Sequence, residues 1–321
     1  MKVKFCKTEV EYPSEKLGVL RDSGHLVNDI IELKERIKQD GYLLLKNFIS
    51  PETVLTAREA IVNYLEENKA LVEGEPLMEA VMPKSGREVR MTGQSVITHH
   101  PSSLAVFENK KLFDFFRLYF GEDAVTYDYK WLRAVGNESF TGCHYDTVYM
   151  GRGSQNVHTV WIPIGNIPVS QGTLAILEGS HNLESFAPLR NTYGRIDVDR
   201  DMISEGWFSS DPFEITDKFG GRWLTTTFNP GDVLIFGLFT MHASTTNLTD
   251  KFRISCDIRF QPAGEKMDER WAGKRPVGHY AWGEEEAKER PITDLRKEWG
   301  IQSQIKMPCL ALTLIKNYDN Y

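Results

Sequence analysis

The feature that most constrains this chain is a histidine and an aspartate separated by one residue, His144 and Asp146. On a β-strand, residues i and i+2 point to the same face, so this imidazole and this carboxylate would project together. A second imidazole, His242, follows on a later strand-like segment. Two histidines and one carboxylate form a facial triad that holds Fe(II) and leaves other coordination positions open. The pattern therefore predicts a β-sheet scaffold that carries a metal site.

The segments around these residues have the composition of antiparallel strands. Residues 124–135 are rich in aromatic and β-branched side chains and end at a Gly-Asn turn, and residues 157–164 continue the pattern. The turn Pro-Gly-Asp at 230–232 precedes an apolar strand over residues 233–236. We therefore expect the His-x-Asp pair on one strand of an antiparallel sheet and His242 on another.

An arginine follows the second histidine. Residues 252–260 alternate between apolar and polar side chains, which predicts a strand paired with the one that carries His242. Arg253 lies on the polar face of this strand, so it can reach the same cavity. Its planar guanidinium binds a carboxylate through two hydrogen bonds. A dicarboxylate such as 2-oxoglutarate needs such an anchor at its distal end while its keto-acid end chelates the iron.

Together these features resemble the phytanoyl-CoA dioxygenase family of Fe(II)- and 2-oxoglutarate-dependent oxygenases, over about residues 28–262. The resemblance implies a mainly β fold with flanking helices around a double-stranded β-helix, or jelly-roll, core. It also implies iron ligation by His144, Asp146 and His242, co-substrate binding by Arg253 and Ser244, and O2 as the oxidant. The matching segments are His144-x-Asp146, Trp-Ile-Pro-Ile at 161–164, Gly-Thr-Leu at 172–174, Glu-Gly-Ser-His at 178–181, Pro-Gly-Asp at 230–232, and His242 with Arg253.

The activity implied by the resemblance is oxidation of an unactivated C–H bond in a small organic substrate, first of all hydroxylation, with release of succinate and CO2. Desaturation or oxidative cyclisation at the same iron is an alternative. Asp146 argues against halogenation, because related halogenases carry a small residue at that position. An alternative of another class is a non-catalytic jelly-roll that binds a small ligand. Arg253 argues against it, since a structural metal site needs no dicarboxylate anchor.

Three further residues are candidates for the substrate pocket. Tyr149 follows the His-x-Asp pair closely, Trp161 lies on the next predicted strand, and Arg152 offers a charge for an anionic group. Each has a simpler interpretation, which is a core or cavity wall for Trp161 and a solvated charge for Arg152. The sequence does not identify the substrate.

Composition excludes several classes of partner. The net charge of −7 and the pI of about 5.7 give no basic surface for nucleic acid. The four cysteines are scattered, as is typical of free thiols in a reducing compartment. No apolar run approaches the roughly 20 residues of a membrane-spanning helix, and the first residues lack the apolar stretch of a signal peptide. We expect a cytoplasmic protein with a small-molecule substrate, without a membrane or nucleic-acid partner. The oligomeric state is open.

The order of the segments predicts one domain over residues 1–321. An N-terminal helical part spans about 24–121, and the jelly-roll core spans about 124–262. The core is interrupted by a charged insert at about 183–221, which lacks a β-pattern and is expected to be a loop that covers the substrate. A C-terminal extension, 263–321, has helical patterns over 283–290 and 292–299. Helices are also predicted over 27–39, ended by Gly41, and over 101–120, ended by Gly121. A further helix is predicted from Ser50 as its N-cap, with Pro51 at the first position, to about Asn68.

Overall fold

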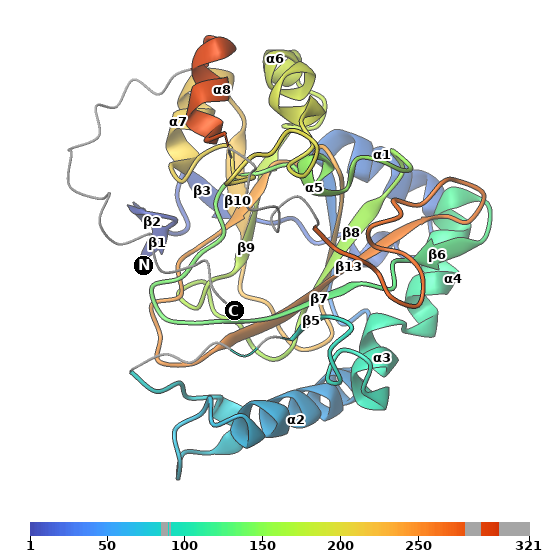
Figure 1. The fold of residues 1–321 in the computed structure, drawn as a ribbon, viewed down its shortest axis with the longest axis vertical. Helices are drawn as coiled ribbons and strands as arrows, with labels where there is room; N and C mark the ends of the chain where they lie inside the picture. The colour runs from blue at the N-terminus through green and yellow to red at the C-terminus, as the bar shows by residue number, and fades with distance from the viewer. Residues whose placement is uncertain (85–88, 90, 280–289, 302–321) are drawn as a thin grey trace.

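The computed structural model describes residues 1–84, 89, 91–279 and 290–301 (Figure 1). Within this part of the chain, thirteen strands and eight α-helices alternate with short 3-10 turns. The strands are β1 (Lys2–Phe5), β2 (Thr8–Glu11), β3 (Leu17–Val19), β4 (Tyr42–Leu45), β5 (Thr92–Gly93), β6 (Ala124–Thr126), β7 (Lys130–Val135), β8 (His158–Pro163), β9 (Leu174–Glu178), β10 (Arg222–Thr225), β11 (Val233–Gly237), β12 (His242–Ser244) and β13 (Arg253–Pro262). The helices are α1 (Ile30–Asp40), α2 (Pro51–Glu67), α3 (Pro101–Phe107), α4 (Lys110–Phe120), α5 (Thr147–Met150), α6 (Ala187–Asn191), α7 (Pro212–Phe219) and α8 (Ile292–Glu298).

Two β-sheets form the centre of the molecule. The larger has the strand order β4-β11-β8-β13-β7-β5, with β6 beside β13, and the smaller has the order β12-β9-β10-β3. Apolar side chains from both sheets pack against one another between them, which is the face-to-face arrangement of a β-sandwich. This inner cluster includes Tyr42, Leu44, Trp161, Ile176, Leu224, Leu234 and Phe236. The predicted mainly β, jelly-roll-type core with flanking helices is thus confirmed, although the two sheets do not close into a barrel.

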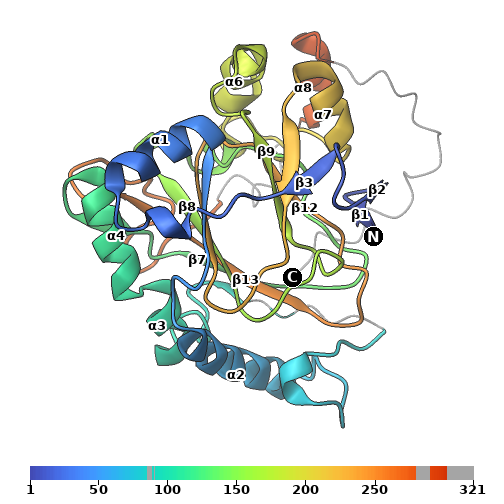
Figure 2. The ribbon, with the colours of Figure 1, turned by 180° about the vertical axis from the view of Figure 1, so that it is seen from behind.

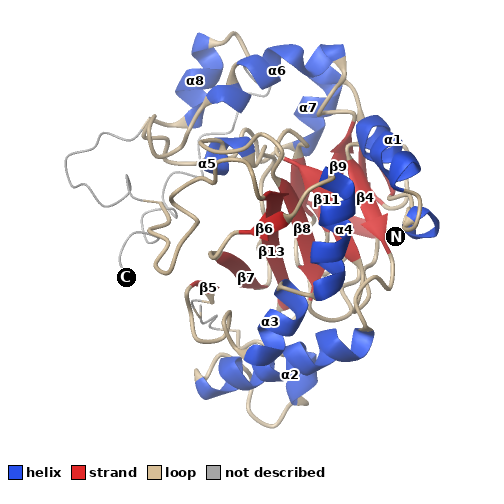
Figure 3. Cartoon of the chain, turned by 90° about the vertical axis from the view of Figure 1, so that its right-hand side faces the viewer, coloured by secondary structure: helices blue, strands red, loops and turns tan. Residues whose placement is uncertain are grey.

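Helices cover the outer faces of both sheets. Alternate residues of the larger sheet, such as Val160, Ile162, Ile254 and Ile258, pack with apolar residues of α1, α2, α3 and α4. Figures 2 and 3 show these helices against that sheet, with α4 lying across its strands. The smaller sheet is covered by β1 and by α6, α7 and α8, which lie together in Figure 1. One face of each sheet is therefore apolar and covered, and the opposite face lines the interior.

The helix boundaries follow the capping residues that the sequence shows. The Asp29 side chain accepts a hydrogen bond from the Glu32 amide at the start of α1, and Gly41 ends the helix with a φ of 84°. Residues 101–120 form two helices rather than one, because the Asn109 side chain accepts from the Lys111 amide and starts α4. Gly121, with a φ of 79°, ends α4 as expected.

Two segments differ from the sequence-based expectation. Residues 183–221 are not a long loop, because they contain α6, α7 and two 3-10 turns, and Asp211 caps α7 by accepting from the Phe213 amide. The first residues add strands to the core, since β3 pairs in parallel with β10 at the edge of the smaller sheet. In the C-terminal extension, α8 matches the second predicted helix, whereas residues 283–289 of the first lie outside the described residues. No helix in the described ranges is both long and apolar enough to cross a lipid bilayer.

Candidate metal centre

The structure brings His144, Asp146 and His242 together in the interior. One ligand atom from each residue lies within 4.8 Å of the others, and all three residues are buried. Nε2 of His144 and Nε2 of His242 each lie 3.7 Å from Oδ1 of Asp146. The two imidazole rings are 4.0 Å apart between centroids. Two imidazole nitrogens and one carboxylate oxygen therefore converge on a common point, as a facial triad requires.

The backbone positions the ligands in a different way from the predicted strand. His144 and His242 form an isolated antiparallel bridge, in which each amide donates to the other's carbonyl at 3.0 Å. The chain then turns, and Asp146 adopts a helical conformation with φ −65° and ψ −25° immediately before α5. The prediction that the His-x-Asp pair alternates along one strand is therefore wrong. The bridge sets the distance between the imidazoles, and the turn brings the carboxylate to them.

Hydrogen bonds fix the orientation of both imidazoles. Nδ1 of His144 lies 2.8 Å from the Gly142 carbonyl, and Nδ1 of His242 lies 3.0 Å from the Thr240 carbonyl. A carbonyl can only accept, so each Nδ1 carries the proton and each Nε2 presents a lone pair. Burial, and then the neighbouring His242, lowers the pKa of His144 to about 3. This imidazole is therefore neutral at physiological pH and suited to a metal.

The two oxygens of Asp146 have different surroundings. Oδ1 faces the imidazoles, whereas Oδ2 accepts hydrogen bonds from the Thr159 hydroxyl and, at 3.1 Å, from Nη2 of Arg259. Burial alone would raise the pKa of this carboxyl, but Arg259 first and then both imidazoles hold the pKa well below its usual range. Asp146 is thus ionised, with Oδ1 available to a cation.

Thr159 and Arg259 also contact the site, although neither was among the residues predicted for it. The signal for Arg259 was present, because residues 252–260 alternate and Arg259 shares a face with Arg253. In β13 the residues Ile254, Cys256 and Ile258 pack toward the helices, so the arginines lie on the opposite, interior face. The sequence contains no comparable indication for Thr159. This residue lies near Asp146 because it pairs with Arg259 between strands β8 and β13.

Arg253 is a buried cation without an acidic partner. Arg253 is 3% exposed, its Nη1 donates to the Ser255 hydroxyl, and its Nε has no acceptor among the described residues. Among the described residues no carboxylate lies within ion-pair distance of its guanidinium, and burial lowers the pKa of Arg253 to about 10. The predicted pairing of its strand with the strand of His242 is wrong. β13 pairs with β6, β7 and β8 in the larger sheet, and β12 pairs with β9 in the smaller one.

Ser244 is buried two residues after His242 on β12, where its hydroxyl accepts from the Thr141 amide at 2.8 Å. Tyr149 lies on α5, and its ring contacts the ring of His144, one of the three candidate metal ligands. Its ring centroid lies 5.5 Å from that of His144, at an interplanar angle of 82°.

The other two candidate substrate residues have different surroundings. Trp161 is 2% exposed within the inner apolar cluster and packs on Phe228 at 4.7 Å between centroids. Arg152 pairs with Asp197 of the 183–221 insert, through Nε at 2.5 Å and Nη2 at 3.0 Å. Its contact with Asp197 links the loop after α5 to the insert.

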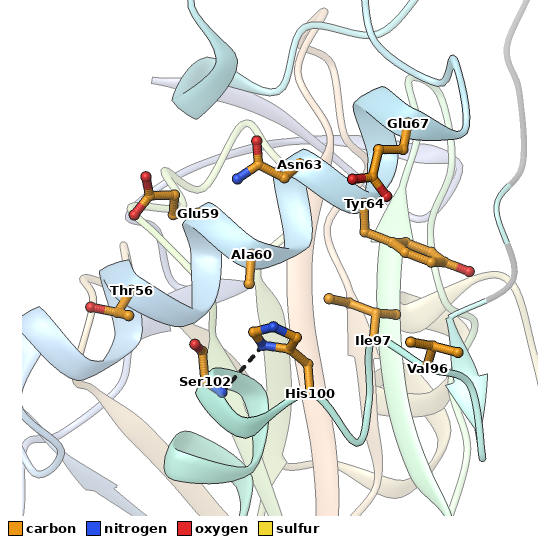
Figure 4. Close-up of a pocket in the computed structure, with 10 residues that line it drawn as sticks. All are labelled: Thr56, Glu59, Ala60, Asn63, Tyr64, Glu67, Val96, Ile97, His100 and Ser102. Carbon is orange, nitrogen blue, oxygen red and sulfur yellow. Dashed lines mark hydrogen bonds between the residues drawn. The ribbon is translucent and has the colours of Figure 1, made fainter.

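Two hollows on the surface do not include the ligand residues. One, of about 380 Å³, lies between α2 and the segment that enters α3 (Figure 4). There the His100 ring lies below Ala60 and accepts a hydrogen bond from the Ser102 amide through Nδ1. The other, of about 580 Å³, is lined partly by residues 237–240, which lead into the His242 strand. The first hollow therefore lies apart from the metal centre. The second lies on the other side of the backbone segment 237–240, which precedes the metal-ligand strand β12.

Comparison with known proteins identifies relatives in sequence and in fold. Two 1-deoxypentalenic acid 11-beta-hydroxylases are similar in sequence. That of Streptomyces arenae is 28% identical over 254 residues, which cover 75% of this chain and 84% of the relative. That of Streptomyces exfoliatus is 27% identical over 264 residues, with the same coverage.

Solved structures share the fold at low sequence identity. EctD from S. alaskensis with bound Fe has a TM-score of 0.55 at 15% identity and covers 91% of this chain and 95% of that protein. The epimerase SnoN, in complex with Fe3+, alpha ketoglutarate and nogalamycin RO, has a TM-score of 0.53 at 16% identity, with coverages of 82% and 94%. Residues 37–255, more than half of the chain, match the sequence profile of a single family. This protein belongs to the phytanoyl-CoA dioxygenase (PhyH) family.

Proposed function

We propose that this protein is an Fe(II)- and 2-oxoglutarate-dependent dioxygenase that hydroxylates an unactivated C–H bond of a small organic substrate and releases succinate and CO2. The observation that carries the proposal is the convergence of Nε2 of His144, Nε2 of His242 and Oδ1 of Asp146 on one point. Family membership and the hydroxylase relatives support the same reaction class.

The donor set fits Fe(II). Each imidazole holds its Nδ1 against a backbone carbonyl, so that Nε2 is the ring nitrogen left for a metal, and the carboxylate is ionised without an extra proton to displace. When bound, iron and 2-oxoglutarate would together activate O2, the oxidant, for the breaking of a C–H bond. The protein contributes the three ligands and an apolar surround, in which Phe236 packs 4.6 Å from the His242 ring. This surround keeps bulk water away from the metal.

Arg253 is the proposed anchor for the distal carboxylate of 2-oxoglutarate. A buried cation without a counter-ion is costly, and a bound carboxylate removes that cost. Its Nε has no acceptor within the described part of the chain, so the guanidinium still has a donor to offer. Ser244, two residues after a metal ligand on β12, is proposed to donate its hydroxyl to the same carboxylate.

The substrate is proposed to be a small organic molecule of the natural-product type, in contact with Tyr149 beside His144. Hydroxylation is preferred because the two Streptomyces relatives described above are hydroxylases of an organic acid. Desaturation or oxidative cyclisation would use the same residues. We propose no role at the substrate for Trp161, which belongs to the inner cluster, or for Arg152, which is paired with Asp197.

An anaerobic titration tests the proposal. The protein is loaded with Fe(II), 2-oxoglutarate is added, and the visible charge-transfer band of the chelate is recorded. We expect the band to form with the natural protein and to be lost in His242→Ala, which removes one metal ligand. Binding of Fe(II) without the band would instead favour a jelly-roll that binds some other ligand, and the oxygenase proposal would fail.

Arg253→Met makes the test specific for the co-substrate anchor. We expect Fe(II) affinity to stay and the 2-oxoglutarate concentration for half-saturation to rise about 100-fold, as is usual when one partner of a buried charge pair is truncated. The matched control is Arg200→Met, since Arg200 is 61% exposed and pairs with Asp201 on the surface. An unchanged 2-oxoglutarate requirement in Arg253→Met would show that the anchor lies elsewhere.

A further inference from the structure

Arg259 contacts a metal ligand without being one itself. Its Nη2 donates to Oδ2 of Asp146 at 3.1 Å, and the residues are 3% and 2% exposed. Within the described ranges, Asp146 is the carboxylate with which Arg259 forms an ion pair, and its Nη1 has no acceptor. The guanidinium is therefore directed at one oxygen of one carboxylate.

The surroundings of Arg259 keep its guanidinium in place. Its Cζ lies 4.6 Å from the centre of the Trp131 ring, and its Nε lies 3.1 Å from Sδ of Met150. Across the sheet, Arg259 of β13 pairs directly with Thr159 of β8. The two donors that reach Oδ2 thus come from adjacent positions on two central strands, which are rigid elements of the fold.

The hydrogen bonds of Asp146 are asymmetric. Two donors, from Thr159 and Arg259, converge on Oδ2, whereas Oδ1 has no hydrogen-bond donor among the described residues. Each carboxylate oxygen can accept about two hydrogen bonds. If Asp146 served only as a counter-charge, donors would be expected on both of its oxygens. The bare oxygen is the one that lies 3.7 Å from both imidazole Nε2 atoms.

We propose that Arg259 is a positioning residue for the metal centre. Together with Thr159 it occupies Oδ2 of Asp146, so that this carboxylate binds the metal through Oδ1 alone and leaves one more coordination position open. The inference rests on the proposed iron site, and it assigns a role to an arginine distinct from Arg253. Residues that orient metal ligands in this way commonly change affinity or activity about 10- to 100-fold when they are replaced.

The proposal predicts opposite effects on two ligands. Arg259→Met keeps an unbranched side chain against Trp131 but removes one of the two donors to Oδ2 and a positive charge beside the metal. Fe(II) should then bind at least as tightly as in the natural protein, because Oδ2, left with the Thr159 hydroxyl as its donor, becomes more accessible to the metal. With 2-oxoglutarate bound, a further small ligand should bind more weakly, because the extra oxygen takes its position.

The experiment measures both affinities anaerobically. Fe(II) binding is followed by calorimetry, and nitric oxide is then titrated into the Fe(II)–2-oxoglutarate form and followed by electron paramagnetic resonance. We expect Arg259→Met to lower nitric oxide affinity about tenfold or more without weakening Fe(II) binding. Arg259→Lys, which returns a cationic donor to Oδ2, should restore a large part of the affinity. Thr159→Val should produce a smaller change in the same direction as Arg259→Met.

Each outcome decides a different point. If the natural protein binds Fe(II) but never forms the 2-oxoglutarate band, the proposed function fails. If that band forms and Arg259→Met binds nitric oxide like the natural protein, the positioning role alone is overturned. Loss of Fe(II) binding in a folded Arg259→Met protein would also overturn it, because the arginine would then be needed to retain the ligand. If Arg259→Met does not fold, Arg259→Lys and Thr159→Val carry the test, and unchanged nitric oxide affinity in both overturns the proposal.

Discussion

The imidazole of His158 lies among aromatic rings at the start of β8, and this environment keeps it neutral. The rings of Phe116, Tyr119 and Phe120 have centroids 5.0 to 6.0 Å away, and Nδ1 lies 3.0 Å from the Asn156 carbonyl. Burial lowers the pKa of His158 to about 4. Protonation would place an uncompensated charge against α4, so this residue links stability to pH.

The sign of the effect follows from the two states. In the unfolded chain the imidazole takes up a proton as the pH falls through about 6.5, whereas in the folded protein it does so only near 4. Stability is therefore full above 6.5 and falls as the pH drops toward 4. Because His158 is only half-buried, we expect the loss to be about 1–2 kcal/mol.

Urea unfolding of the natural protein and of His158→Phe between pH 4 and 7.5 measures this contribution. The phenylalanine keeps an aromatic ring against α4 but cannot titrate. The variant should lose less stability than the natural protein as the pH falls, while His144 and the other titratable groups contribute equally to both. Parallel curves for the two proteins would show that His158 is not protonated in this range.

Single residues also show where sequence reasoning succeeded and where it stopped. The residue types and spacing of His144, Asp146 and His242 predicted three ligands in one place, and the structure puts their ligand atoms within 4.8 Å. The spacing did not show how they meet, because the bridge between His144 and His242 joins residues far apart in the chain. The same holds for Thr159 and Arg259, whose roles depend on register between strands.

At the scale of the secondary-structure elements, two helix starts that each have a capping-type residue make different contacts. The Asp29 side chain accepts from the Glu32 amide at 3.1 Å and caps α1. Ser50 occupies the corresponding position before α2, but its side chain makes no capping hydrogen bond. The sequence predicted a cap at Ser50 from its type, whereas side-chain orientation decides whether the hydrogen bond forms.

This difference gives a paired prediction. Asp29→Ala leaves an amide of the first turn of α1 without its acceptor and should lower the free energy of unfolding by about 1 kcal/mol. Ser50→Ala removes no capping hydrogen bond, and Pro51 still favours the start of α2, so its effect should stay within about 0.5 kcal/mol. Urea unfolding of both variants is the measurement. Equal losses would mean that the Ser50 hydroxyl caps α2 in solution.

The elements that could be predicted were those whose ends are marked by residues in the local sequence. Gly41 and Gly121 end α1 and α4 as their positions in the sequence indicate, because a left-handed residue terminates a helix at little cost when it is glycine. The insert at 183–221 was harder, since its helices are short and depend on packing against the smaller sheet. The pairing of β13 could not be predicted, because any of several strands with the same alternation fits its apolar face.

At the scale of the whole molecule, a buried network of charges joins the insert to the segment that follows β13. Arg270 contacts Asp268 through Nη2 at 2.6 Å and also pairs with Asp199, and all three side chains are fully buried. Asp197 connects the same network to Arg152 beside α5, and the His279 ring lies 3.0 Å from Asp199. These ion pairs thus join segments that are distant in sequence, next to the metal centre.

Removing the central cation should loosen this whole region. Arg270→Met leaves Asp199 and Asp268 buried without their main counter-charge, which commonly costs about 3–5 kcal/mol. Arg200→Met is the control, since its surface pair with Asp201 should contribute less than about 1 kcal/mol. Urea unfolding gives the stabilities, and hydrogen exchange should show faster exchange over residues 193–208 in Arg270→Met alone.

Because Tyr149 packs between His144 and His279, the loosened variant should also bind Fe(II) more weakly. Unchanged exchange in Arg270→Met would mean that the apolar contacts of α6 and α7 hold the insert without the charges.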